Sequence, residues 1–187
     1  MTAPVTFLIP HLPGRTESLA RMIDSVHAQT ISGEALLVCA MAPNPELSRP
    51  GNTARSLNAL LPSVKTEWLA PIADDDLLLP NYIEAALPHF DHADLIYSYD
   101  RDGRLPMVDC AQWPTTGSLF DRLRAGNFIT YCFIRTLLVR QLGGWTEDLL
   151  PGMFEDWDLF IRLAGVAAQF RCVPEATFVY SGSHHDG

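Results

Sequence analysis

Apolar residues follow two alternating patterns along the first half of this chain. Short continuous runs, rich in β-branched residues, predict buried strands over residues 5–9, 35–41, 68–73 and 94–99. Stripes that recur every three or four positions predict helices from Thr16 to near Gly33, from Ala54 to Val64 and from Pro80 to Phe90. Strands and helices that alternate in this way are typical of parallel sheets covered by helices. We therefore expect an α/β fold with a Rossmann-like, mostly parallel central sheet and helices on both faces.

The second half of the chain has a less regular pattern. A turn at residues 102–103 and a long connection over residues 106–117 are expected first. Helices are then predicted over residues 119–125, over 137–142 and from 154 to 167. Residues 126–129 lead into the apolar run at 132–134, and two final strand-like runs occupy residues 170–173 and 177–180.

Composition indicates a single compact domain. The 187 residues are 48% hydrophobic and 19% charged, and no apolar run approaches the length of a membrane span. No basic region followed by a long apolar segment marks a secretory signal. Four widely separated cysteines favour buried free thiols in a reducing compartment: Cys39, Cys110, Cys132 and Cys172. We therefore expect a cytoplasmic protein without stable membrane insertion.

The net charge of −9 disfavours nonspecific binding to nucleic acid, because no broad positive field is present. Four arginines that lie close in sequence could still form a local basic patch: Arg122, Arg124, Arg135 and Arg140. A nucleic-acid acceptor is thus left open, although the net charge does not indicate one.

Three consecutive carboxylates, Asp74, Asp75 and Asp76, follow the predicted strand at residues 68–73. Neighbouring unit charges near a protein surface repel by roughly 4 kcal/mol at 4 Å. The three side chains should therefore either separate into water or share a cation. Ligands of open parallel sheets bind outside the carboxyl ends of the strands, which favours a site here.

A second acidic group, Glu155, Asp156 and Asp158, begins the predicted helix at residue 154. Carboxylates at that position stabilise the positive end of a helix dipole, which alone would account for them. The upstream turn Gly143-Gly144-Trp145 favours a different interpretation, since aromatic rings beside carboxylates commonly hold a sugar ring.

These motifs together resemble the family 2 glycosyltransferases of the GT-A fold. The resemblance begins with the run 5–10 and the helix ending at residues 24–30, and continues with Ala54-Arg55 and the aspartates, which resemble the metal-binding D-x-D region. It is most specific over residues 142–147 and 154–163, which match the acceptor-side motif of the family. The resemblance spans nearly the whole chain, in the order of the family.

The resemblance implies an inverting transfer of a sugar from a nucleotide-diphosphate sugar, expected to be a UDP-sugar, to an acceptor hydroxyl. It makes residues 1–100 the nucleotide-sugar-binding half and 101–187 the acceptor-binding half of one GT-A-like domain. Asp156 matches the catalytic base, and the acceptor side would comprise Glu155, Gly144, Trp145 and Trp157. Donor-binding positions would be Pro10, Arg15, Arg55, Asp74 and Asp75. Mn²⁺ or Mg²⁺ would be held by Asp76, Asp74 and His184, with His185 as the alternative histidine.

The chain departs from the family pattern in two places. The acidic pair that usually follows the second strand is missing from residues 38–42, so base recognition must differ. Aligning Pro80 with the family's proline puts Ala73 where the leading aspartate normally stands. The metal-binding pair is then either Asp74 with Asp76 or Asp75 with Asp76. The chain is also short for the family, and we expect no added acceptor domain or membrane-attachment helices, which favours a soluble, small or macromolecular acceptor.

Two other classes of function remain as alternatives. A nucleotidyltransferase also uses metal-holding aspartates, but it should have a glycine-rich phosphate loop after the first strand, where only Gly14 is present. A non-catalytic module that binds nucleotide sugars or glycans would account for Ala73 and the missing acidic pair. The acceptor, whether glycan, protein, lipid, metabolite or modified DNA base, is left open.

Overall fold

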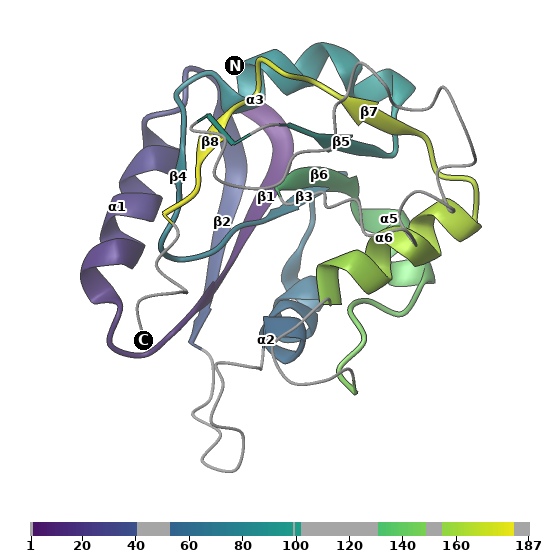
Figure 1. Ribbon diagram of the computed structural model, residues 1–187, viewed down its shortest axis with the longest axis horizontal. Coiled ribbons are helices and arrows are strands. Elements are labelled where there is room, and N and C mark those ends of the chain that lie inside the picture. Colours follow the sequence, from purple (N-terminus) through teal and green to yellow (C-terminus); the bar gives the residue numbers. More distant parts are fainter. Residues whose placement is uncertain (1, 41–52, 99, 102–130, 149–154, 182–187) are drawn as a thin grey trace.

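The computed structural model describes residues 2–40, 53–98, 100–101, 131–148 and 155–181. Its first part contains β1 (Thr2–His11), α1 (Thr16–His27), β2 (Ser32–Ala40), α2 (Thr53–Leu60), η1 (Leu61–Ser63), β3 (Trp68–Pro71) and β4 (Leu77–Leu78). Next come α3 (Tyr82–Ala86), η2 (Leu87–His92) and β5 (Leu95–Tyr97). The last described elements are β6 (Cys132–Arg135), α5 (Thr136–Gln141), α6 (Glu155–Gly165), β7 (Phe170–Cys172) and β8 (Phe178–Val179). Figure 1 shows their arrangement around a central sheet.

The central sheet has six strands in the order β2-β1-β3-β6-β5-β7. β1 pairs in parallel with β2 and β3, and β5 pairs in parallel with β7. β6 is antiparallel to both of its neighbours, β3 and β5. The prediction of a mostly parallel α/β sheet is therefore confirmed. Two short strands, β4 and β8, form a separate antiparallel pair.

Helices cover both faces of the sheet, as predicted. Alternate residues of β1 point to opposite faces, because successive side chains of a strand alternate. Phe7 packs in one core cluster with residues of α1 and α3, such as Met22 and Ile83. Leu8 packs in the other cluster with residues of α2, α5 and α6. Figure 1 shows α1 and α6 on opposite sides of the sheet.

Several predicted boundaries differ from the structure by a few residues, most clearly those of the first helix and the third strand. The first helix ends at His27, and β2 already begins at Ser32, where it pairs with the start of β1. The buried Gln29 side chain donates to the carbonyl of Leu79 (2.8 Å), which fixes the chain between helix and strand. The third strand ends at Pro71, which lacks a donor, and Ile72 N–H donates to the Leu8 carbonyl at 3.0 Å instead. The turn at 102–103, the connection at 106–117 and the helix at 119–125 lie outside the described residues.

The expectation of free cysteines is wrong for Cys172, and Cys110 lies outside the described residues. Cys132 is a buried free thiol and Cys39 is a half-buried thiol, but Cys172 of β7 is disulfide-bonded. Spacing alone did not reveal this, because a disulfide depends on which distant segments meet in the fold. None of the described helices is long and apolar enough to cross a membrane.

Candidate active site

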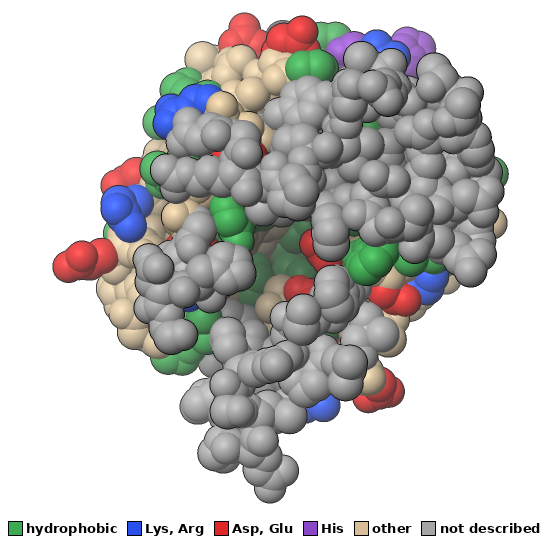
Figure 2. All heavy atoms as spheres, viewed as in Figure 1, with side chains coloured by type: hydrophobic (Ala, Val, Ile, Leu, Met, Phe, Trp, Pro, Cys, Tyr) green, Lys and Arg blue, Asp and Glu red, His purple; other side chains and the backbone are tan. Residues whose placement is uncertain are grey.

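The three aspartates lie where β3 ends, at the edge of the sheet at which the parallel strand β1 also ends. Asp74, Asp75 and Asp76 are 2%, 6% and 1% exposed. Carboxylates buried to this degree require hydrogen-bond or charge partners. Figure 2 shows the molecule hollowed near the centre of one face, with acidic side chains visible at the hollow.

The turn between β1 and α1 holds the first two aspartates. Asp74 accepts a hydrogen bond from the Leu12 backbone N–H (2.8 Å) and lies 3.0 Å from Nδ1 of His11. Arg15 donates from Nη1 to Asp75 at 2.7 Å and to Asp74 at 3.3 Å. Arg15, expected to bind the donor, is therefore the cation that these two carboxylates share. Its role toward a nucleotide sugar stays a prediction.

Asp76 has different partners from Asp74 and Asp75. Its carboxylate accepts hydrogen bonds from the hydroxyl of Tyr131, just before β6, and from the backbone N–H of Ser181 (2.6 Å), just after β8. Burial raises the pKa of Asp76, and the nearby Asp75 charge acts in the same direction, while the two hydrogen bonds lower it. Burial, with the charges of Asp76, Asp75 and Asp100, also raises the pKa of Tyr180. Tyr180 and Ser181, which follow β8, thus lie beside this acidic cluster.

The donor chemistry of the cluster fits a hard divalent cation, since Mg²⁺ and Mn²⁺ prefer carboxylate oxygens. Within the part of the chain that the structure describes, no three His, Cys, Asp or Glu side chains come together in a way that could hold a metal ion. If Asp76 held a metal ion together with Asp74 or Asp75, these carboxylates would therefore lose contacts to Arg15 or Tyr131 and gain contacts to the ion. His184 and His185 lie outside the described residues.

The second acidic group lies in the first turn of α6. Burial raises the pKa of Asp156 to about 7, and the adjacent Glu155 charge acts in the same direction. Burial also raises the pKa of Glu155. Because a general base works best with a pKa near the operating pH, Asp156 has the property that this role requires.

The start of β6 connects the two acidic groups. β6 runs antiparallel to β3, so its first residues lie near the carboxyl end of β3. Tyr131 contacts Asp76, and the next residue, Cys132, lies close enough to Asp156 that this charge, after burial, raises the pKa of its thiol. Asp76 and Asp156 therefore act on two adjacent residues, Tyr131 and Cys132 respectively, although they are far apart in the sequence.

The Gly-Gly-Trp turn ends α5 and leads toward α6. Trp145 is only 3% exposed and belongs to the core cluster that includes α2, α5 and α6. The structure thus shows Trp145 as a packing residue, and contact with an acceptor stays a prediction, as it does for Gly144. Trp157 is half-buried in the first turn of α6.

Two expected donor-binding residues lie at different depths. Pro10 is buried in β1, where it pairs with Cys39 of β2. Arg55 projects from α2, is 61% exposed along its side chain and forms an ion pair with Glu147 at 3.5 Å. Neither residue's role toward a nucleotide is tested by these contacts.

Four partners of the site are not apparent from the sequence: Asn58, Tyr131, Arg162 and Ser181. Each forms a hydrogen bond with a residue at least 18 positions away. Arg162, for example, donates to the Gly144 carbonyl, and Tyr131 donates to Asp76. Tyr131 and Ser181 belong to no motif, so no local signal identifies them. Asn58 interrupts the apolar stripe of α2 with a polar side chain, which is a weak signal.

Comparison with solved structures shows the class of fold. Residues 1–349 of S. aureus TarS superpose with a TM-score of 0.71 at 16% identity, covering 93% of this chain and 59% of that one. The Pyrobaculum calidifontis mannosyltransferase PcManGT, solved with GDP-Man and Mn²⁺, gives 0.69 at 14% identity, covering 97% and 57%. The catalytic domain of Drosophila β1,4-galactosyltransferase 7, solved with xylobiose, gives 0.65 at 15% identity, covering 97% and 73%.

The chain therefore has the GT-A fold of these glycosyltransferases. It spans less than two thirds of the TarS and PcManGT chains. Neither a protein-family model nor a curated protein matches the sequence.

Proposed function

We propose that this protein is a metal-dependent inverting glycosyltransferase, which transfers a sugar from a nucleotide-diphosphate sugar to an acceptor hydroxyl. The proposal is supported by two carboxylates that act on adjacent residues: Asp76 accepts a hydrogen bond from Tyr131, and the charge of Asp156 acts on Cys132. One buried carboxylate has the chemistry of a metal ligand, and the other has the pKa of a general base. The fold supports the same reaction class.

In the proposed reaction, the acceptor hydroxyl attacks the anomeric carbon from the face opposite the diphosphate. Asp156 takes the hydroxyl proton as the new carbon–oxygen bond forms. The bond from the anomeric carbon to the diphosphate oxygen breaks, and its electron pair leaves with the nucleoside diphosphate. Attack from the opposite face inverts the anomeric configuration.

Residues of the β1–β3 edge would bind the donor. Asp76, with Asp74 or Asp75 and with His184 or His185, would hold Mn²⁺ or Mg²⁺, which when bound neutralises charge on the leaving diphosphate. Arg15 lies beside the same carboxylates and would turn its guanidinium toward the diphosphate. Arg55 is assigned to the nucleotide, and Pro10 to the wall of the donor site.

The acceptor would approach from the side of α6. Glu155 would orient the acceptor hydroxyl toward Asp156, and Trp145, Gly144 and Trp157 would shape the acceptor site. TarS and PcManGT have been solved with UDP-GlcNAc and GDP-Man respectively. A UDP-sugar is the first donor to test and a GDP-sugar the second. The acceptor is assigned only as a molecule that bears a hydroxyl group.

The function is tested by donor binding and transfer in matched variants. A nucleotide sugar at about 100 times its Kd should raise the free energy of unfolding by about 2.7 kcal/mol, measured with and without Mn²⁺. Asp76→Asn should abolish the Mn²⁺-dependent part, whereas Asp91→Ala, an exposed residue of η2, should not. Asp156→Asn should keep donor binding but lower transfer by about 10²–10⁴-fold.

Three results would contradict the proposal. Full transfer by Asp156→Asn would remove the base assignment. Unchanged Mn²⁺-dependent binding by Asp76→Asn would remove the metal assignment. Donor binding without transfer to a broad panel of acceptors, and without slow hydrolysis of the donor, would favour a non-catalytic binding module.

A further inference from the structure

One side chain from α2 satisfies both backbone groups of Trp145. Oδ1 of Asn58 accepts a hydrogen bond from the Trp145 N–H at 2.9 Å. Nδ2 of the same amide donates to the Trp145 carbonyl at 2.8 Å and to the Glu147 carboxylate at 2.8 Å. A single side chain that pairs with both groups of one residue fixes the position and the direction of that backbone.

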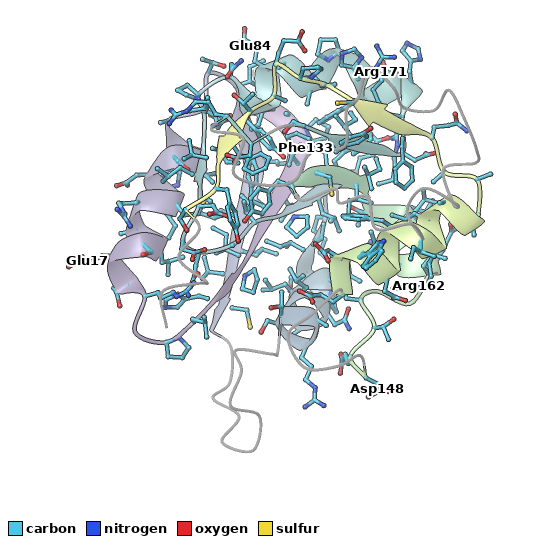
Figure 3. The ribbon with its side chains drawn as sticks, viewed as in Figure 1. Glu17, Glu84, Phe133, Asp148, Arg162 and Arg171 are labelled. Atoms are coloured by element: carbon cyan, nitrogen blue, oxygen red, sulfur yellow. The ribbon has the colours of Figure 1, made fainter. Side chains whose placement is uncertain are left out.

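The other side of the same turn is held by α6. Arg162, labelled in Figure 3, donates to the Gly144 carbonyl at 2.9 Å and to the Asp158 carboxylate at 2.8 Å. Asp158 also accepts a hydrogen bond from the Thr146 hydroxyl at 2.6 Å. Three consecutive residues, 144 to 146, therefore lie between Asn58 on α2 and the first two turns of α6.

The fit between α2 and this turn is close. A Cβ atom at Gly144 would lie 2.3 Å from Oδ1 of Asn58, so the contact requires glycine at that position. Asn is a weak helix former, and α2 packs into the core through its buried residues Ala54 and Leu57. Packing of α2 alone thus gives no reason for an amide at position 58, whereas the paired hydrogen bonds to Trp145 do.

We infer that Asn58 is a positioning residue, which sets the place of the α6 N-terminus through the turn at residues 144–146. That terminus carries Glu155 and Asp156, and Asp158 is two residues further on. The catalytic part of this inference rests on the proposed function, since it makes Asn58 orient the acceptor side of the site. A shift of about 1 Å in a catalytic group can lower a rate about a hundredfold.

The test compares Asn58→Ala with Asn81→Ala. Asn81 is an exposed residue whose amide donates a single hydrogen bond to the Glu175 carbonyl at 2.9 Å, away from the turn. In Asn58→Ala, amide hydrogen exchange should become faster both at residues 144–146 and at 155–165. The kcat of transfer should fall about tenfold to a hundredfold, with the Kd of the nucleotide sugar within about twofold of wild type. Asn81→Ala should change none of these.

A second variant keeps the test decisive if Asn58→Ala does not fold. Asn58→Asp with Glu147→Gln keeps an acceptor for the Trp145 N–H, loses the donor to the Trp145 carbonyl and avoids repulsion between two carboxylates. Its kcat should be lower than that of wild type, and its amide exchange at residues 144–146 and 155–165 should be faster. Three results would overturn the inference: faster exchange confined to residues 144–146, an unchanged kcat, or a loss of donor affinity as large as the loss of kcat.

The structural part of the inference about Asn58 can be tested even if the proposed function is wrong. If the wild type transfers no sugar, the exchange measurement alone decides whether Asn58 sets the α6 N-terminus. Faster exchange at residues 155–165 would then support the structural link, and unchanged exchange there would overturn it.

Discussion

At the scale of single residues, the three aspartates avoid mutual repulsion by turning to different partners. Asp74 and Asp75 share the guanidinium of Arg15, and Asp76 turns toward Tyr131 and Ser181. We expected the carboxylates either to separate or to share a cation. Asp74 and Asp75 share a cation that the protein itself supplies, the guanidinium of Arg15. A protein cation that occupies the cluster also keeps it folded before any ligand binds, because buried carboxylates without partners are costly.

The raised pKa of Asp156 predicts how transfer depends on pH. A general base must be ionised, so kcat/KM should increase as the pH rises through about 7 and then level off. Measurement of kcat/KM from pH 5.5 to 9, with subsaturating donor, tests this pH dependence. Asp91→Ala should leave the midpoint unchanged, and a rate already constant above pH 5 would contradict the assignment.

The same shift has an effect on stability that does not depend on activity. The carboxyl of Asp156 holds its proton up to about pH 7 in the folded state, but only to about 3.8 in the unfolded state. The folded state therefore loses relative stability as the pH rises from about 4 to 7. The stability of Asp156→Asn, relative to wild type, should increase over that range in urea unfolding, and it should not change below it.

At the scale of elements, the turn after α5 depends on two glycines with positive φ. Gly143 and Gly144 both have φ of 80°, a conformation that costs other residues roughly 1–2 kcal/mol. No atom lies within 4 Å of a Cβ at Gly143, whereas a Cβ at Gly144 would meet Asn58. Gly143→Ala should thus lower the free energy of unfolding by about 1–2 kcal/mol, and Gly144→Ala by about 1–3 kcal/mol more.

Chemical denaturation of the two variants makes this comparison directly. The pair is matched in backbone conformation, so the difference between them isolates the contact with Asn58. Equal losses would mean that the turn moves freely away from α2, which would also weaken the inference about Asn58.

At the scale of the whole molecule, the two expected halves build one sheet. β6, from residues 101–187, lies between β3 and β5, which both come from residues 1–100. Phe133 of β6 lies centrally in Figure 3 and packs between Tyr82 and Phe90 at ring-centroid distances of 4.7 and 5.5 Å. Residues from the two expected halves therefore share one sheet and one core cluster.

This topology predicts that residues 1–100 do not fold alone. Without β6, β3 and β5 have no common neighbour, and buried residues such as Leu69 and Leu95 would be exposed. The isolated fragment should lack the cooperative thermal transition of the full chain in near-ultraviolet circular dichroism. A cooperative transition of the fragment at a similar temperature would contradict a single unit.

Much of this architecture follows from the sequence, because periodicity is local. Runs and stripes of apolar residues predicted the α/β class and most of the described strands and helices, but not the two-residue β4 or β6. The same reasoning placed the aspartates at the end of a strand and Asp156 at the start of a helix. What stays a prediction is the role of each candidate residue toward donor, metal and acceptor.

Only the tertiary structure decided which distant segments meet. It inserted β6 between β3 and β5, turned Tyr131 toward Asp76, paired Asn58 with Trp145 and placed Cys172 in a disulfide. It also raised the pKa of Asp156, since burial depends on everything packed around a group. The sequence by itself determined the elements and their candidate chemistry, whereas contacts across many residues determined how that chemistry is held and tuned.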